Sequence, residues 1–193
     1  MKVSLRELHG PWDCGWALDK HTISSVCIGR DEDGRPIFDT ERTEIGEAVY
    51  RLKYRGELTQ AVPLAQAVAA NICPRFARVD AIVPMPASQR RVRQPVGEVA
   101  AALGRLLGRP VLHGLLTRRP PAVPMKNLPT KTEKIDAIGD SFGVIDRISG
   151  GASRSILLLD DLFDTGATME AACGALRAYT KIGRIYAAAL TWK

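Results

Sequence analysis

Residues 155–168 constrain the fold of this chain most strongly. They begin with an uninterrupted apolar run, residues 156–159, of the kind that forms a strand buried on both faces. Two adjacent carboxylates, Asp160 and Asp161, follow this run, and a short polar loop then leads into a helix-forming sequence. A strand, an acidic pair, a polar loop and a helix in this order predict a ligand site at the carboxyl end of an α/β sheet.

The polar loop of this segment has the chemistry of a phosphate site. The residues predicted to surround the phosphate are Asp164, Thr165, Gly166, Ala167 and Thr168. Hydroxyls and free backbone N–H groups at a helix N-terminus bind phosphate, and the helix dipole favours its negative charge. The carboxylates of Asp160 and Asp161 hold sugar hydroxyls or a hydrated Mg²⁺. A ligand with a phosphate at one end and a diol in its middle fits both halves.

The same pattern has a structural alternative, in which the loop serves only turn geometry and helix capping. Asp164 or Thr165 is sufficient as an N-cap. A cap does not require two further carboxylates at the end of the preceding strand, so the pattern favours a ligand site.

The alternation of helices and strands after residue 44 predicts the fold class. Apolar spacing predicts helices over residues 44–54, 61–72, 96–107 and 169–179, and strands over residues 79–83, 111–116, 141–145, 156–159 and 184–192. This order predicts an α/β fold with a central, mostly parallel sheet and helices on both faces. Residues 118–140 are polar, hold four prolines and have no apolar periodicity, which is typical of a functional loop.

The first 40 residues have a different pattern and are predicted to form a small antiparallel β-region. Trp12, Cys14 and Trp16 alternate with other residues, a second strand-like run covers residues 22–28, and residues 31–34 are a strong turn signal. The chain is therefore divided into a β-rich hood, residues 1–40, and an α/β domain, residues 41–193.

Bulk composition narrows the class of protein. No apolar run is long enough for a membrane span, and the N-terminus lacks the apolar core of a signal peptide, so a cytoplasmic location is expected. The net charge of +6 is compatible with nucleic acid and equally with a small polyanion. A metal site formed by His9, Cys14, His21 and Cys27 is an alternative to small buried thiols, although the irregular spacing disfavours it.

Residues 155–168 resemble the phosphoribosyl pyrophosphate motif of type I phosphoribosyltransferases, which consists of hydrophobic residues, two acidic residues and a Thr-Gly-x-Thr loop. Every polar position of that motif is filled here. The resemblance implies that Asp160 and Asp161 form the catalytic pair on the ribose hydroxyls, and that residues 164–168 hold the 5′-phosphate. It also implies Mg²⁺, bound through the ligand and not directly by the protein, and it makes a homodimer an expectation, because dimers are common in the family.

The resemblance also implies a second site element in the loop after residues 79–83, which holds the pyrophosphate in this family. Its predicted residues are Met85, Pro86, Ala87, Ser88 and Arg91. A leaving pyrophosphate needs backbone N–H donors, a hydroxyl and positive charge. Prolines at positions 84 and 86 have no N–H group, so the expected donors are the amides of Met85, Ala87 and Ser88. The structural alternative is a turn followed by a solvated basic helix end.

The order of shorter patterns is similar to the ComF-type, competence-associated branch of the family. K-Y-R-G at residues 53–56 and S-F-G-V at residues 141–144 precede the acidic pair. The N-terminal four-cysteine metal-binding module of that branch is missing, and a tryptophan-rich β-region stands in its place.

Two functions follow from the resemblance. The first is a Mg²⁺-dependent phosphoribosyltransferase for an unidentified nitrogenous base, with the hood residues His21, Trp12 and Trp16 beside the base; the alternative for the two tryptophans, and the more frequent one, is the core of a small sheet. Residues 118–140 would be its lid, and the lid cations near the pyrophosphate would be Arg118, Arg119, Lys126, Lys131 and Lys134. The second is a non-catalytic protein that retains the phosphoribosyl pyrophosphate site and acts in DNA uptake or as a metabolite sensor. Direct binding of nucleic acid rests on charge alone.

Overall fold

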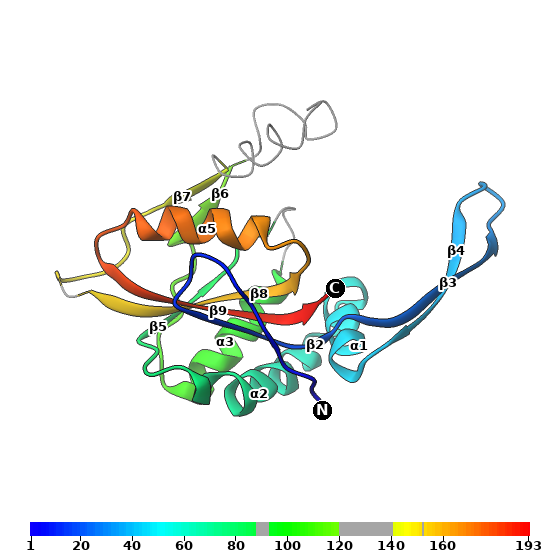
Figure 1. The fold of residues 1–193 in the computed structure, drawn as a ribbon, viewed down its shortest axis with the longest axis horizontal. Helices are drawn as coiled ribbons and strands as arrows, with labels where there is room; N and C mark the ends of the chain where they lie inside the picture. The colour runs from blue at the N-terminus through cyan, green and yellow to red at the C-terminus, as the bar shows by residue number, and fades with distance from the viewer. Residues whose placement is uncertain (88–92, 120–140, 152) are drawn as a thin grey trace.

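A computed structural model describes residues 1–87, 93–119, 141–151 and 153–193. Within these residues the central sheet has five strands in the order β1-β2-β9-β8-β5 (Figure 1). The strands span Arg6–Glu7 (β1), Cys14–Lys20 (β2), Ile182–Trp192 (β9), Arg154–Phe163 (β8) and Ala81–Pro84 (β5). β2, β9, β8 and β5 run parallel to one another, and β1 pairs antiparallel with β2. The mostly parallel sheet predicted from the sequence is confirmed.

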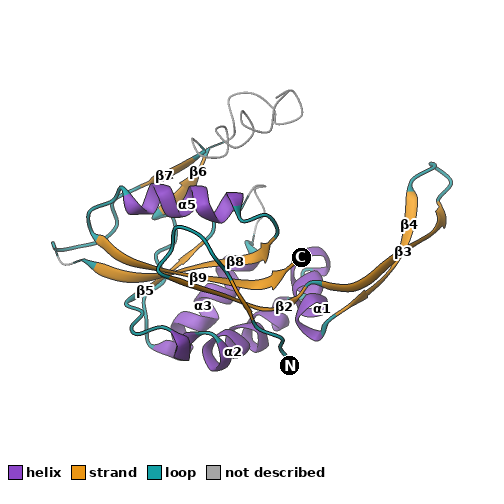
Figure 2. Cartoon of the chain, in the orientation of Figure 1, coloured by secondary structure: helices purple, strands orange, loops and turns teal. Residues whose placement is uncertain are grey.

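Helices cover both faces of the sheet (Figure 2). On one face pack α1 (Glu44–Tyr50), α2 (Ala61–Asn71) and α3 (Pro95–Leu107), and on the other packs α5 (Ala167–Arg177). Alternating residues of β8 enter the two cores, Leu157 and Leu159 on the first face and Ile156 and Leu158 on the second. All four side chains are fully buried, because each face of the strand is covered by a helical layer.

Local signals set the helix boundaries. Thr43 caps α1 by accepting a hydrogen bond of 3.0 Å from the amide of Gly46. The chain continues from α1 into a π-helical segment, η1 (Arg51–Arg55), which ends at Gly56 with a φ of 69°. Two 3₁₀ turns, η2 (Leu58–Gln60) and η3 (Cys73–Arg75), flank α2. None of the described helices has the length and apolar content to cross a membrane.

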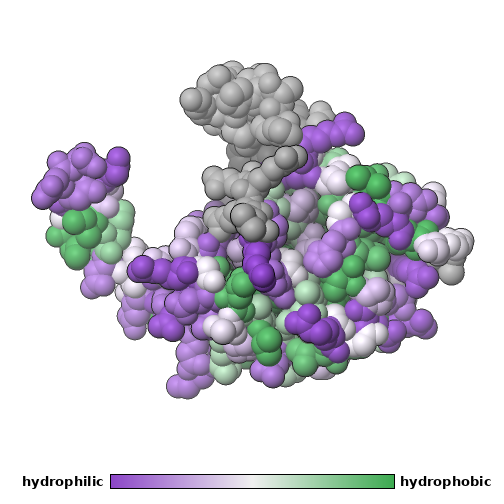
Figure 3. All heavy atoms as spheres, turned by 180° about the vertical axis from the view of Figure 1, so that it is seen from behind, coloured by the Kyte–Doolittle hydropathy of each residue, from purple (hydrophilic) through white to green (hydrophobic). Residues whose placement is uncertain are grey.

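The small antiparallel β-region predicted for the first 40 residues is wrong in one respect. β2 pairs in parallel with β9, so it belongs to the central sheet. The next two strands, β3 (Thr22–Arg30) and β4 (Pro36–Arg42), form the predicted antiparallel hairpin, which projects away from the body (Figure 1 and Figure 3). The alternating pattern of β2 predicts a half-buried strand but not its partner, which lies at the other end of the chain. The domain division at residue 40 stays a prediction.

The strand predicted over residues 111–116 is also wrong. Val111 forms an isolated bridge with Ile82, and the chain then turns through Gly114, which has a φ of 71°. A short strand, β6 (Leu116–Arg118), follows this turn and pairs antiparallel with β7 (Phe142–Val144). Most of the predicted lid, residues 120–140, lies outside the described residues.

Candidate functional site

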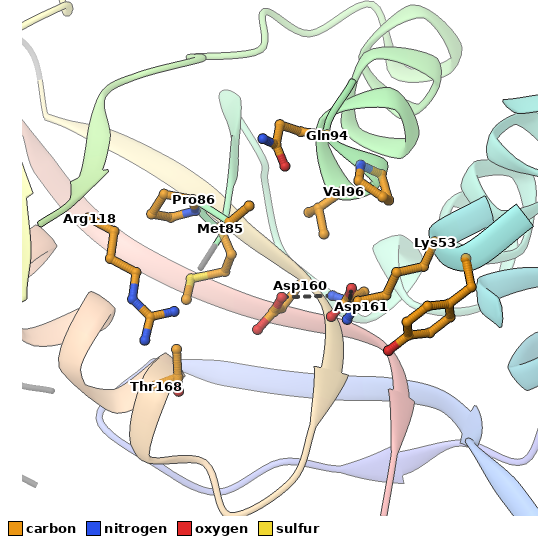
Figure 4. A pocket seen from close by; sticks show the side chains of 12 residues that line it. Lys53, Met85, Pro86, Gln94, Val96, Arg118, Asp160, Asp161 and Thr168 are labelled. Atoms are coloured by element: carbon orange, nitrogen blue, oxygen red, sulfur yellow. Dashed lines mark hydrogen bonds and ion pairs between the residues drawn. The ribbon is translucent and has the colours of Figure 1, made fainter. Parts of the chain in front are cut away.

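The carboxyl ends of β5 and β8 meet at one edge of the sheet, where a cavity of about 370 Å³ opens (Figure 4). This volume is in the range of small-molecule sites. The cavity is lined by Lys53, Tyr54, Met85, Pro86, Ala87, Gln94, Pro95, Val96, Arg118, Asp160, Asp161 and Thr168. The fold thus brings together the acidic pair, the loop after β5 and the first turn of α5, which lie far apart in the sequence.

The acidic pair lies within β8, which continues past both carboxylates to Phe163. Side chains alternate along a strand, so Asp160 and Asp161 leave its backbone on opposite faces. Oδ2 of Asp161 lies 2.7 Å from Nζ of Lys53, a residue of η1 (Figure 4). Oδ1 of Asp160 accepts a hydrogen bond of 2.8 Å from the amide of Asp161. Both carboxylates line the same cavity from the two sides of the strand.

The electrostatics of the pair differ from those of an exposed carboxylate. Burial, and next the neighbouring charge of Asp161, raise the pKa of Asp160 to about 7. Lys53 and Arg118 lower the pKa and so oppose this shift in part. Arg118 extends from β6 towards Thr168 in Figure 4, on the other side of the acidic pair from Lys53. A carboxyl group that titrates near neutral pH between two cations is typical of a functional site.

The predicted phosphate loop surrounds a second, smaller hollow of about 90 Å³. This hollow is lined by Asp164, Thr165 and Gly166, and it shares Asp160 and Thr168 with the larger cavity. Ala167 is the first residue of α5. The amide groups of a first helical turn have no partner within the helix, so this end of α5 offers hydrogen-bond donors to an anion.

The capping alternative for this loop is wrong. The N-cap of α5 is Gly166, which has a φ of 87° and provides no side-chain hydrogen bond. The carboxylate of Asp164 instead lies 3.3 Å from Nζ of Lys193, near the end of β9. Neither Asp164 nor Thr165 is therefore needed to cap the helix.

The loop after β5 is at the cavity as predicted, with Met85, Pro86 and Ala87 in its lining. Ser88 and Arg91 lie outside the described residues. The amide of Met85 donates a hydrogen bond of 2.8 Å to the carbonyl of Leu159, so the expectation that this N–H serves a pyrophosphate is wrong. Proline has no N–H to donate, which leaves the amide of Ala87 among the described residues of this loop.

Five residues of the lining were not predicted as site residues: Lys53, Tyr54, Gln94, Pro95 and Val96. The first two belong to the K-Y-R-G pattern and directly follow Leu52, the last buried residue of the apolar face of α1 and η1. The sequence signal that could have identified Lys53 as a site residue is its position directly after the end of this apolar face. Of the proposed lid cations, Arg118 lines the cavity, whereas Lys126, Lys131 and Lys134 lie outside the described residues.

The aromatic residues of the predicted hood belong to the cores. Trp12 is 7% exposed, and its indole N–H donates a hydrogen bond of 2.8 Å to the carbonyl of Leu8. Trp16 packs against the core beneath α1, α2 and α3, with the guanidinium of Arg75 over its ring. In the part of the chain that the structure describes, neither tryptophan ring is among the side chains that line the cavity.

His21, in contrast, lies next to the site. Its Nδ1 is 3.1 Å from Oγ1 of Thr191, whose hydroxyl donates a hydrogen bond of 2.8 Å to the carbonyl of Asp161. Burial, followed by the charges of Arg42 and Lys53, lowers the pKa of His21. Within the described residues no three His, Cys, Asp or Glu side chains gather to hold a metal ion, so the metal site considered for His9, Cys14, His21 and Cys27 is wrong.

Comparison with protein-family models and with curated proteins gives no match. Solved structures of adenine phosphoribosyltransferases are similar to this chain. The structure from Leishmania tarentolae is 13% identical, with coverage of 98% of this chain and 79% of its own and a TM-score of 0.47. The structure from Thermoanaerobacter pseudethanolicus is 16% identical, with coverage of 89% and 95% and a TM-score of 0.43. The structure from Saccharomyces cerevisiae, complexed with an imino-altritol bisphosphate and adenine, is 14% identical, with coverage of 87% and 85% and a TM-score of 0.41.

Proposed function

We propose that this protein binds phosphoribosyl pyrophosphate where β5 and β8 end. The observation that supports the proposal most is that the two hollows share two lining residues, Asp160 and Thr168. The 5′-phosphate would lie in the smaller hollow, the ribose diol beside the acidic pair, and the pyrophosphate near Ala87 and Arg118.

The reaction class that we propose is phosphoribosyl transfer to a nitrogenous base. A nitrogen of the base forms a bond to the ribose C1 while the bond from C1 to the pyrophosphate oxygen breaks, and its electron pair leaves with the pyrophosphate. Positive charge develops on the sugar in this transition state. The negative charge of the Asp160 and Asp161 carboxylates would favour it, and Arg118 would supply positive charge for the leaving group.

Mg²⁺ fits the donors at this site, because carboxylate oxygens are hard ligands of the kind that the ion prefers. The ion would bind through the diol and pyrophosphate oxygens of the ligand, and the carboxylates of Asp160 and Asp161 would orient the diol beside it. Two carboxylates alone are too few for a tight site, so the proposal is that the ion binds with the ligand. When bound, it supplies charge neutralisation for the leaving pyrophosphate.

A second function uses the same site without transfer. The K-Y-R-G pattern, on which the resemblance to the ComF-type branch depends, supplies Lys53 and Tyr54 to the cavity. In this second function the protein binds phosphoribosyl pyrophosphate as a metabolite sensor or in DNA uptake and does not transfer the sugar. The two functions differ in one observable, the release of pyrophosphate when a base is added.

Pyrophosphate release in the presence of Mg²⁺ and a panel of purine and pyrimidine bases tests the proposal. We expect release with one class of base, reduced at least about 100-fold in the double variant Asp160→Asn and Asp161→Asn. The matched control is Glu32→Gln with Asp33→Asn, an adjacent acidic pair in the exposed turn between β3 and β4. If the protein bound phosphoribosyl pyrophosphate but released no pyrophosphate with any base, the transferase proposal would be wrong and the second function would stand.

A further inference from the structure

The hairpin of β3 and β4, residues 22–42, extends from the body of the protein and is here called the arm (Figure 1 and Figure 3). Five large apolar side chains on it are between 44% and 65% exposed: Ile23, Val26, Ile28, Ile37 and Phe38. An isolated two-stranded hairpin is marginally stable in water, and exposed apolar side chains that lie together mark an interaction surface. The arm therefore has the properties of an element that is covered in its working state.

The apolar side chains lie on both faces of the arm. Cys27 is paired with Phe38, and the next pair in the register, Val26 with Asp39, faces the opposite side. A flat partner would cover one face and leave the other in water. The occupant must therefore offer a surface that encloses the arm.

Charge indicates which partner fits. The arm holds three arginines, at positions 30, 35 and 42, and five carboxylates, at positions 31, 32, 33, 39 and 41, which gives it a net charge of −2. The whole chain carries +6, so the rest of the chain carries +8, the difference between these two values. An acidic arm is repelled by nucleic acid and by anionic lipid, whereas the basic body of another copy of this chain attracts it.

We propose that the arm of one copy docks on the body of a second copy, and that the exchange is reciprocal in a symmetric dimer. In such a dimer each copy contributes both its arm, about 20 residues long, and the surface that receives the partner's arm. A stable interface uses roughly 20–30 residues from each side, so the reciprocal arrangement reaches the required size. The exposed apolar side chains of both arms become buried in it.

Sedimentation equilibrium of the full chain tests this proposal. We expect a dimer for the wild type, and a dissociation constant raised by roughly tenfold or more for Val26→Ser with Ile28→Ser, because two exposed apolar side chains per arm lose their burial. The matched control is Ile145→Ser, since Ile145 is 49% exposed but lies after β7 on the body. Melting temperatures of the three proteins at low concentration check that the body is folded in each.

Charge gives a second, independent readout. Glu32→Lys with Asp39→Lys reverses two exposed acidic side chains of the arm, and it is expected to weaken the dimer at low ionic strength. The difference from the wild type should shrink as salt is added. A wild type that is monomeric at its highest soluble concentration would overturn the proposal. A dimer that keeps its dissociation constant in both double variants would overturn it too, because the copies would then meet through another surface.

Discussion

Nζ of Lys53 lies 2.7 Å from Oδ2 of Asp161, and this contact joins the π-helical segment after α1 to the strand that carries the acidic pair. Both side chains are shielded, with 28% of Lys53 and 17% of Asp161 exposed. An ion pair in such surroundings is stronger than one on the surface, because less water screens it. Lys53 also lowers the pKa of Asp160, so this one ammonium acts on both carboxylates of the pair.

Replacement of Lys53 by methionine is therefore expected to weaken the binding of phosphoribosyl pyrophosphate by about tenfold or more, the equivalent of one charge-assisted hydrogen bond. The variant keeps the length and the apolar stem of the side chain but leaves Asp161 without this ammonium. Lys53→Arg retains the charge and should keep most of the affinity. Calorimetric titration of both variants measures the effect, and equal affinity of Lys53→Met and wild type would contradict the role given to this contact.

The raised pKa of Asp160 predicts a stability that falls as pH rises from about 4 to about 7. Over this interval the native state holds a proton on Asp160 that the unfolded state has already released, so the free energy of unfolding decreases with pH. Asp160→Asn removes the cost of burying the charge. We expect it to stabilise the protein by on the order of 2 kcal/mol at about pH 8, with little effect at about pH 4.

Urea unfolding of wild type and Asp160→Asn across this pH range measures the difference directly. Groups that titrate alike in both proteins cancel in the comparison. A stability difference that does not change with pH would show that the carboxyl of Asp160 titrates in the ordinary range.

Substitution of Gly166 by alanine tests the phosphate loop. Its φ of 87° is in the left-handed region, and an added Cβ would lie 2.9 Å from Cζ of Phe163 and 3.2 Å from Oε1 of Glu170. We expect a loss of about 1–2 kcal/mol of stability from the backbone conformation, and a loss of ligand affinity because the loop must shift.

Gly150→Ala separates these two effects. Gly150 has a φ of 80°, and nothing lies within 4 Å of its added Cβ, so it carries the backbone cost without the contacts. Thermal unfolding should show a loss of stability in both variants, at least as large in Gly166→Ala as in Gly150→Ala, and calorimetry should show a loss of affinity for Gly166→Ala alone. A Gly166→Ala protein that binds the ligand as the wild type does would remove the loop from the site.

The acidic pair and the polar loop could be predicted from the sequence because their signal is local. A fully apolar run, two carboxylates, a glycine and a helix-forming stretch follow one another in residues 155–177, and each has a physical meaning on its own. Helix boundaries such as Gly108, which ends α3 with a φ of 61°, are local signals as well.

The partners of these segments could not be predicted in the same way. Strand pairing between β2 and β9 joins the two ends of the chain, and periodicity within a segment carries no information on its neighbour. The contact between Lys53 and Asp161 could not be predicted either, because it depends on the packing of α1 and η1 beside the end of β8. A hydrogen bond from the amide of Met85 to Leu159 likewise depends on the register between β5 and β8.

The most direct test of the central claim is calorimetric titration of phosphoribosyl pyrophosphate into the protein, with and without Mg²⁺. The site described here predicts binding in the micromolar range, about −8 kcal/mol, that is stronger with Mg²⁺ and is lost in Asp160→Asn with Asp161→Asn. The control pair, Glu32→Gln with Asp33→Asn, should bind as the wild type does. Absence of binding to the wild type, or equal binding by the site variant, would contradict the assignment of the acidic pair and its loop to this ligand.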